Sequence, residues 1–231
     1  MSGAGGGWAR RRTTAAAIAA AVLMATAGCG GGDEEDRPDA RSTRPSGPKP
    51  LTKGQLLAAV LVEGDVGAYT SEQTYDDEGP VGDLYTARPE VCQPLVSLAD
   101  VSDSDAEPGV FVDLQLRSYT AEDATAVMKA LGKAGESCAD GFTEERVFVD
   151  AEVLRVETLR APAAGDEAHA FRITTQDVKN DSLKLYEYLT VVRSGSTTLS
   201  FRAYVLGTED VGGVPQDAVD ARWEKYRRTT P

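Results

Sequence analysis

Three cysteines, one histidine and 37 acidic residues carry most of the reactive chemistry available to this 231-residue sequence. A cysteine thiolate is a nucleophile and a metal ligand. Cys29 follows a run of small residues near the N-terminus, whereas Cys92 and Cys138 lie in the body of the chain. Because His169 has no second histidine to work with, a His-based metal site or catalytic triad is not expected. His169 falls in a predicted strand, on the side of Phe171, and is expected to be a structural or edge histidine.

The acidic residues gather in two segments. The carboxylate oxygens of alternate residues in the segment 100–107 could coordinate a hard cation such as Ca²⁺. The segment lacks the central glycine and the distal glutamate of an EF-hand loop, so a solvated acidic loop is the favoured interpretation. Residues 72–83 are interpreted in the same way. Since no nucleophile, phosphate or dinucleotide motif occurs either, the sequence predicts no catalytic, cofactor or metal site.

The N-terminus has the pattern of an export signal. Three arginines, Arg10 to Arg12, precede an uncharged, alanine-rich stretch from Thr13 to Gly28. This stretch is shorter than the roughly 20 apolar positions that a membrane-spanning helix needs. A basic region, a short apolar region and small residues at the end are typical of a signal peptide, which is predicted to occupy residues 1–28.

The end of this signal resembles a bacterial lipobox. Thr26, Ala27 and Gly28 are small residues leading directly into Cys29. The resemblance implies that the chain is cut before Cys29 and that its thiol receives diacylglycerol. Two or more acyl chains, palmitate among them, would hold the protein stably because each buried methylene contributes about 0.8 kcal/mol. The implied location is the outer face of the cytoplasmic membrane, with the membrane as a partner; a plain secretory signal is the alternative.

Composition divides the remaining chain in two. Residues 29–50 are nearly free of apolar side chains and cannot offset their ordering entropy, so they are predicted to form a disordered tether behind the lipidated cysteine. Residues 51–231 carry 32 acidic and 17 basic residues, a formal charge of −15. This charge repels phosphate backbones, so nucleic acid is excluded as a partner. At 41% hydrophobic residues overall, the chain can form one packed extracytoplasmic domain over residues 51–231.

Apolar periodicity predicts that this domain has an α+β fold, with helices packed on an antiparallel sheet. The first predicted helix lies in residues 51–62, with Thr52 as its N-cap, and the second follows the N-cap Thr120. The third occupies residues 215–228, and its predicted buried face is Val219, Trp223 and Tyr226. Predicted strands occupy residues 110–117, 146–159, 168–175, 183–193 and 197–206, the last two joined by the turn Ser194-Gly195-Ser196.

Two features of the strands are more specific. Residues 110–117 alternate, with Val112 and its apolar neighbours on one face and Asp113 on the other, which predicts a half-buried strand. Val153 and Leu154 break the alternation of their strand and predict a β-bulge.

A single disulfide is predicted once Cys29 is assigned to lipid. Cys92 and Cys138 then remain as an even pair in an exported chain, and oxidising surroundings favour their pairing. Two free, buried thiols are the alternative. Thioredoxin-like activity is not expected, because no Cys-x-x-Cys motif brings two thiols together locally.

A second resemblance covers roughly residues 85–205. The segments 91–95, 110–119 and 124–138 are similar in pattern to extracellular sensor domains of actinobacterial receptor kinases and related lipoproteins, in which a strand and a helix precede a cysteine tied back to an earlier one. The chain has neither a kinase domain nor a second cysteine pair. The resemblance implies a cell-surface ligand-binding or sensor module rather than an enzyme.

The leading hypothesis is therefore a lipid-anchored extracytoplasmic module that binds or senses an unknown small molecule or envelope protein. Tyr186, Tyr188 and Tyr204 could line a ligand groove or complete the core. The alternatives from other classes are a cell-surface hydrolase that uses carboxylates and a structural envelope lipoprotein.

Overall fold

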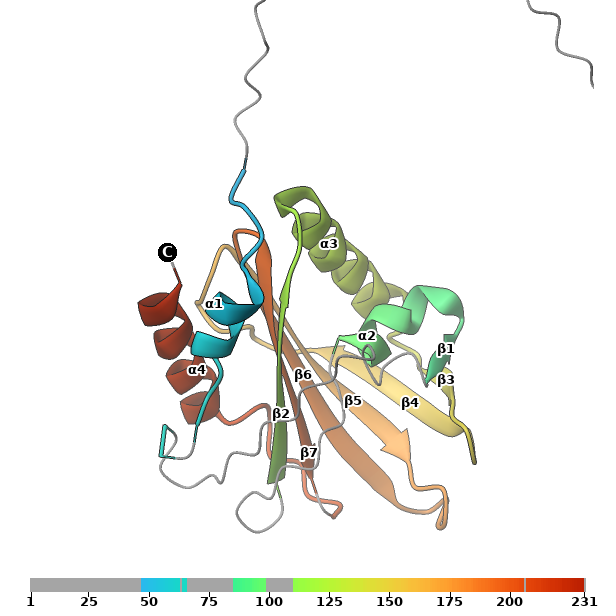
Figure 1. Ribbon diagram of the computed structural model, residues 1–231. Helices are drawn as coiled ribbons and strands as arrows, with labels where there is room; N and C mark the ends of the chain where they lie inside the picture. Colours follow the sequence, from blue (N-terminus) through green and yellow to red (C-terminus); the bar gives the residue numbers. More distant parts are fainter. Residues whose placement is uncertain (1–46, 63, 66–84, 99–109, 206, 231) are drawn as a thin grey trace, which may run out of the picture. The chain divides into compact units, whose positions relative to one another are not determined.

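A computed structural model of the protein describes residues 47–62, 64–65, 85–98, 110–205 and 207–230. The predicted signal peptide, Cys29 and most of the predicted tether lie outside these residues, as do the acidic segments 72–83 and 100–107. The described part is a seven-stranded antiparallel sheet with helices on both faces and one disulfide (Figure 1), which confirms the predicted α+β class.

The sheet is built almost entirely from hairpin neighbours. Its strand order is β1-β3-β4-β5-β6-β7-β2, so only β1 and β2 join it out of sequence. The strands are β1 (Thr86–Arg88), β2 (Val110–Ser118), β3 (Phe142–Glu145), β4 (Ala151–Thr158), β5 (Glu167–Gln176), β6 (Lys184–Ser194) and β7 (Thr197–Val205). The helices are α1 (Lys53–Ala58), η2 (Glu90–Cys92), α2 (Gln93–Ser97), α3 (Ala121–Ser137) and α4 (Gln216–Thr229). None of these helices is long and apolar enough to cross a bilayer.

Two local predictions about the strands are confirmed. β6 and β7 form a hairpin whose turn contains Gly195 at φ +58°, a left-handed conformation that suits glycine. In β4, Val153 pairs with Thr175 and Arg155 with Thr174, so Leu154 is the extra residue of a bulge.

One predicted strand, residues 146–159, begins too early. Residues 142–145 form the separate strand β3, and residues 146–150 turn the chain into β4. The Arg146 amide donates to the Asp150 carboxylate across this turn at 3.4 Å. Short strands joined by a turn without glycine, proline or asparagine leave little periodic signal.

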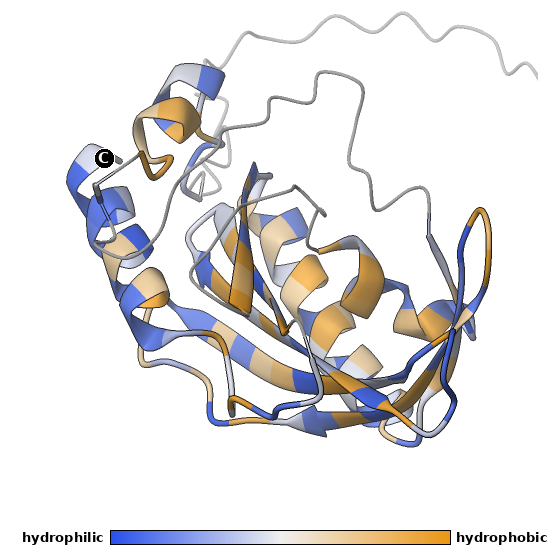
Figure 2. Ribbon diagram, turned by 90° about the horizontal axis from the view of Figure 1, so that it is seen from below, coloured by the Kyte–Doolittle hydropathy of each residue, from blue (hydrophilic) through white to orange (hydrophobic). Residues whose placement is uncertain are grey.

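One face of the sheet is covered by α2 and α3. The N-cap Thr120 accepts a hydrogen bond from the Asp123 amide at 3.1 Å, as predicted. α3 buries Ala124, Met128, Leu131 and Ala134, and the last three pack with apolar side chains of β3 to β6, including Val191. The alternation of apolar and polar residues along the strands is visible in Figure 2.

The opposite face is covered by α1 and α4. Val192, next to Val191 in β6, packs with Val219 and Tyr226 of α4. Trp223 is only partly buried, whereas Arg222, which the sequence did not single out, is buried and donates to the Ala59 carbonyl at 2.7 Å. α1 begins after its cap Thr52 as predicted but ends at Ala58, before the predicted end at residue 62.

The chain reaches the domain before residue 51. The Ser196 hydroxyl in the β6–β7 turn donates to the Lys49 carbonyl at 3.0 Å, and the Leu51 amide donates to the Ser118 hydroxyl at 2.7 Å. The polypeptide therefore enters the domain at the end of the sheet that holds the β6–β7 turn.

α3 approaches β5 most closely at Gly135. A Cβ atom added there would lie 2.2 Å from Cε1 of Phe171, whose ring is buried in the core. We therefore expect Gly135→Ala to lower the free energy of unfolding by about 2 kcal/mol, because the ring and helix must separate. Gly54→Ala in α1 is the control, since a Cβ there meets nothing within 4 Å and should stabilise the helix by up to about 1 kcal/mol. Equal effects of the two substitutions in denaturant unfolding would contradict the close approach.

Candidate functional site

A group of polar side chains, three of them buried and two half-buried, lies on the face of the sheet covered by α2. We define the polar cluster as Asp113, Glu187, Ser200, Arg202 and Tyr204. Asp113 of β2 is paired with Arg202 of β7, and Glu187 of β6 with Tyr204, so these side chains stand next to one another on one face. The expectation that β2 is half-buried is wrong for this part of the strand, because Asp113 is as fully buried as Val112.

Arg202 is the centre of the polar cluster. Its side chain is 6% exposed. It donates to Glu187 Oε2 at 2.9 Å and to the carbonyl oxygens of Leu95 and Val96 at the end of α2. Burial works against its charge, but the nearby Glu187 and Glu144 carboxylates favour it, and the pKa of Arg202 is raised above its ordinary value. Arg202 is therefore a permanent cation that ties the sheet to α2.

Ser200 and Arg202 of the polar cluster have open hydrogen-bonding capacity. Ser200 Oγ and Arg202 Nε are buried, and neither finds a hydrogen-bond partner within the described residues. Buried polar groups in folded proteins nearly always have such partners. Arg202 Nε can only donate, whereas a serine hydroxyl can donate and accept. The pair therefore suits an oxygen acceptor supplied by a small molecule or by water.

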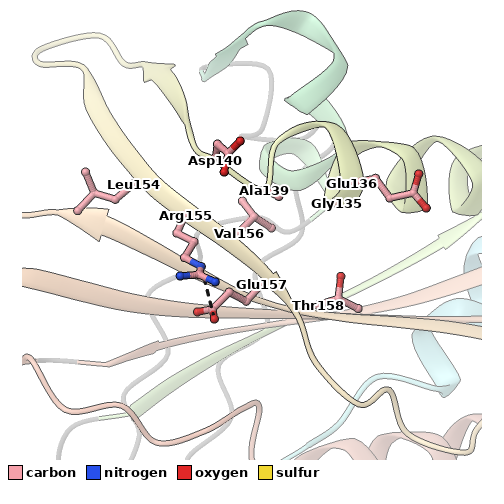
Figure 3. Close-up of a pocket in the computed structure, with 9 residues that line it drawn as sticks. All are labelled: Gly135, Glu136, Ala139, Asp140, Leu154, Arg155, Val156, Glu157 and Thr158. Atoms are coloured by element: carbon pink, nitrogen blue, oxygen red, sulfur yellow. Dashed lines mark ion pairs between the residues drawn. The ribbon is translucent and has the colours of Figure 1, made fainter.

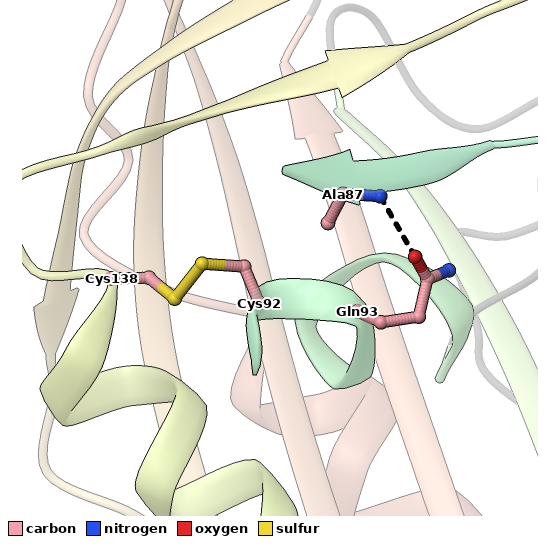
Figure 4. The surroundings of a disulfide bond; sticks show 4 residues. All are labelled: Ala87, Cys92, Gln93 and Cys138. Carbon is pink, nitrogen blue, oxygen red and sulfur yellow. Dashed lines mark hydrogen bonds between the residues drawn. A yellow bond between two sulfur atoms is a disulfide. The ribbon is translucent and has the colours of Figure 1, made fainter. Parts of the chain in front are cut away.

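The disulfide holds α2 over the polar cluster. Cys92 at the end of η2 is bonded to Cys138 at the end of α3, which confirms the predicted pairing (Figure 4). Gln93 adds a second link, because its side chain accepts from the Ala87 amide at 2.8 Å and donates to the Tyr85 carbonyl at 3.0 Å. Both links fix the short helix whose carbonyl oxygens receive the Arg202 guanidinium.

The three tyrosines fall on both faces of the sheet. Tyr186 and Tyr188 share the face of α4, as their spacing predicted, and Tyr188 is part of the core there. Tyr204 lies on the other face, within the polar cluster, where burial raises the pKa of its phenol. Of the two predicted roles, Tyr188 therefore fills the core. Tyr204 keeps a neutral phenol in the candidate site.

Tyr188 makes the stability of the domain sensitive to alkaline pH. Burial and a 2.5 Å hydrogen bond to Asp210 raise the pKa of its phenol to about 12. The folded state favours the neutral phenol, so this contribution is complete below pH 10, the ordinary value, and is lost as pH rises toward 12. We expect the free energy of unfolding to fall across this window, and to fall less steeply in Tyr188→Phe.

Denaturant unfolding at a series of pH values checks this expectation. Asp210→Asn is the graded control, because it removes the weaker of the two causes and should reduce the slope without abolishing it. Identical slopes in the wild type and Tyr188→Phe would contradict the assignment.

An open groove lies between the end of α3 and β4. Its volume is about 660 Å³. Figure 3 shows the residues that line it, which are Gly135, Glu136, Ala139, Asp140, Leu154, Arg155, Val156, Glu157 and Thr158. Arg155 pairs with Glu157 at 3.5 Å, and Arg172 donates to the same carboxylate at 2.6 Å. Since Arg155 and Glu157 are paired with each other and the lining includes no aromatic residue, the groove is a weaker candidate than the polar cluster.

The residues singled out in the sequence have different outcomes. Cys29 lies outside the described residues. His169 lies on the side of Phe171, as predicted, and the two rings stack with centroids 6.1 Å apart. The His169 ring also lies against Gly132. Its Nε2 is 3.4 Å from Glu167. Among the described residues, no three His, Cys, Asp or Glu side chains are grouped to hold a metal.

Sequence reasoning missed Glu187, Ser200 and Arg202. They occupy polar positions of strands that alternate with apolar residues, and such positions ordinarily face solvent. One signal could have pointed to their burial: the domain is long enough, and has enough predicted helices, to cover both faces of its sheet.

Comparison with known proteins supports the fold. No family model matches the chain, and no curated protein matches it. The structure is similar to that of the extracellular domain of PknH from Mycobacterium tuberculosis, with a TM-score of 0.52 and 13% sequence identity over 78% of this chain and 97% of that one. An uncharacterized protein from Mycobacterium smegmatis, described as an Rv0999 ortholog, has a TM-score of 0.33 and 12% identity over 69% of this chain and 78% of that one. The first likeness agrees, at the level of the fold, with the sequence resemblance to receptor-kinase sensor domains.

Proposed function

We propose that the protein is a lipid-anchored, extracytoplasmic binding module of the sensor type, rather than an enzyme, and that the polar cluster is its ligand site. The observation that carries the binding function is the open hydrogen-bonding capacity of Ser200 and Arg202 beneath α2. The fold shared with the extracellular domain of PknH and the disulfide are consistent with a location outside the cytoplasm.

The charge balance of the polar cluster favours a neutral ligand. The Arg202 guanidinium already has the Glu187 carboxylate at 2.9 Å and the buried Asp113 as its strand partner. An added anion would face both carboxylates in a poorly solvated site, which costs free energy. An uncharged molecule with amide or hydroxyl oxygens would satisfy Arg202 Nε and Ser200 without that repulsion.

Thermal unfolding in the presence of small probes tests the binding function. We expect N-acetylglucosamine and glycerol, which are neutral oxygen acceptors, to raise the Tm of the wild type more than acetate or inorganic phosphate at equal ionic strength. Ser200→Ala should abolish the difference, whereas Ser182→Ala, at an exposed loop position, should preserve it. A larger rise with the anions, or an undiminished rise in Ser200→Ala, would overturn the assignment.

The anchor is tested separately by labelling. Cells that export the full chain should incorporate labelled palmitate into the protein, and Cys29→Ala should eliminate the label. Retention of label in that variant would refute lipidation at Cys29 and leave the ligand site untouched.

A further inference from the structure

Most of the large apolar side chains that the described domain exposes lie in three loops. Phe148 is 97% exposed and Val147 is 68% exposed. With them, Val149 belongs to the β3–β4 loop, Val178 and Leu183 belong to the β5–β6 loop, and Val211 belongs to the segment after β7. We call these six residues the apolar tips. Single exposed apolar residues are ordinary, but several grouped on one part of a surface mark an interaction site.

Strand register places the three loops at the same end of the sheet. The start of β4 lies beside the end of β5, because Val153 pairs with Thr175. The end of β5 lies beside the start of β6, and the start of β6 lies beside the end of β7. The β3–β4 loop, the β5–β6 loop and the segment after β7 therefore project from the same end of the sheet. At this end the hairpin tips extend beyond the helices (Figure 1).

Hydrogen bonds within the loops hold their backbones while the apolar side chains point outward. The Asp177 carboxylate accepts from the amides of Lys179 and Asn180, both at 2.8 Å. The Asp210 carboxylate accepts from Tyr188 and from the Gly212 amide at 3.0 Å. Loops ordered before binding lose less conformational entropy when a partner binds.

The charge of the loops selects the chemistry of the partner. Residues 146–150, 177–183 and 207–214 contain five acidic and two basic side chains. We propose that the apolar tips dock a second protein of the envelope, through an apolar recess whose rim is basic. Acidic side chains around an apolar centre would then meet opposite charges at the edge of the interface.

The same charges disfavour two other occupants. A second copy of this chain would bring two domains of charge −15 together, and an anionic leaflet would repel the acidic loops. The chain also enters the domain at the opposite end of the sheet, at Lys49 and Ser196. If the chain is anchored at Cys29, the apolar tips therefore lie on the side of the domain away from the membrane. This point alone rests on the proposed lipid anchor.

Site-specific photo-cross-linking tests this proposal. Benzoylphenylalanine is placed at position 148, 183 or 57 of the full chain in cells that export it, and Leu57 of α1 serves as the control because it is exposed outside the three loops. We expect positions 148 and 183 to give an adduct with the same single protein and position 57 to give none. Purified partner should then bind the wild type in a salt-dependent manner and bind Phe148→Ser about 30-fold more weakly, the loss typical of a central apolar contact.

Each other outcome overturns the proposal. These are adducts with lipid, adducts with a second copy of this chain, equal adducts at position 57, or no adduct at position 148. Unchanged unfolding of Phe148→Ser confirms that its effect is on binding, since this side chain packs against nothing that the fold requires. Cys29→Ala separates the two proposals: it removes the anchor, while purified partner should still bind the apolar tips.

Discussion

Replacing both Cys92 and Cys138 with alanine is expected to lower the free energy of unfolding by about 4 kcal/mol. The bond closes a loop with a sequence separation of 46 residues, and the chain-entropy estimate for such a loop is about 4 kcal/mol. Both cysteines are also buried among apolar side chains. Denaturant unfolding of the oxidised wild type and the double variant measures the difference.

Loss of the disulfide is expected to have a local effect as well as a global one. Because Cys92 precedes α2, opening the bond should release the contacts of α2 before the rest of the sheet. Hydrogen exchange of the Val96 amide should therefore accelerate more than that of Val191 in β6. Reducing the wild type should reproduce the effect of the double variant, and a loss below about 1 kcal/mol in both would show that the bond contributes little.

Removing Glu187 is expected to have the second largest effect, a loss of about 3 kcal/mol in Glu187→Ala. The substitution leaves the buried Arg202 guanidinium without its hydrogen-bonded carboxylate, and breaking a buried ion pair from one side costs about 3–5 kcal/mol. The remaining acids, Asp113 and Glu144, keep the expected loss at the lower end of that range.

An exposed ion pair provides the matched control for Glu187. Glu157 receives Arg172 at 2.6 Å, but both side chains remain about a quarter exposed. Glu157→Ala should therefore cost at most about 1 kcal/mol. The double variant Glu187→Leu with Arg202→Met should recover much of the loss, because an apolar pair avoids the buried charge. Equal losses in the two single variants would show that Arg202 is better solvated than its burial implies.

The elements that the sequence predicted are those with long or specific local signals. The Thr120 cap and the apolar stripe through Met128 define α3, and the turn at Gly195 defines the β6–β7 hairpin. The three residues of β1, the four of β3 and the five of α2 are too short for a period to be recognised. Their places depend on long-range contacts, such as the disulfide and the hydrogen bonds of Gln93.

The candidate site was less predictable for a related reason. Ser200 and Arg202 alternate with Leu199 and Phe201, a pattern that ordinarily describes one buried and one solvated face. Only the cover provided by α2, which the sequence did not reveal, turns those polar positions into a buried cluster. Arg222 escaped notice in the same way, because an arginine on a predicted helix is ordinarily exposed.

The most direct test of the account is the nuclear magnetic resonance signal of the Arg202 side-chain Nε–H group during titration with N-acetylglucosamine. We expect this signal to shift with saturation and the shift to be absent in Ser200→Ala. The Nε–H signal of Arg172, already bonded to Glu157 at 2.9 Å, should not move. A stationary Arg202 signal while the Tm of the protein still rises would place binding elsewhere and contradict the assignment of the polar cluster as the ligand site.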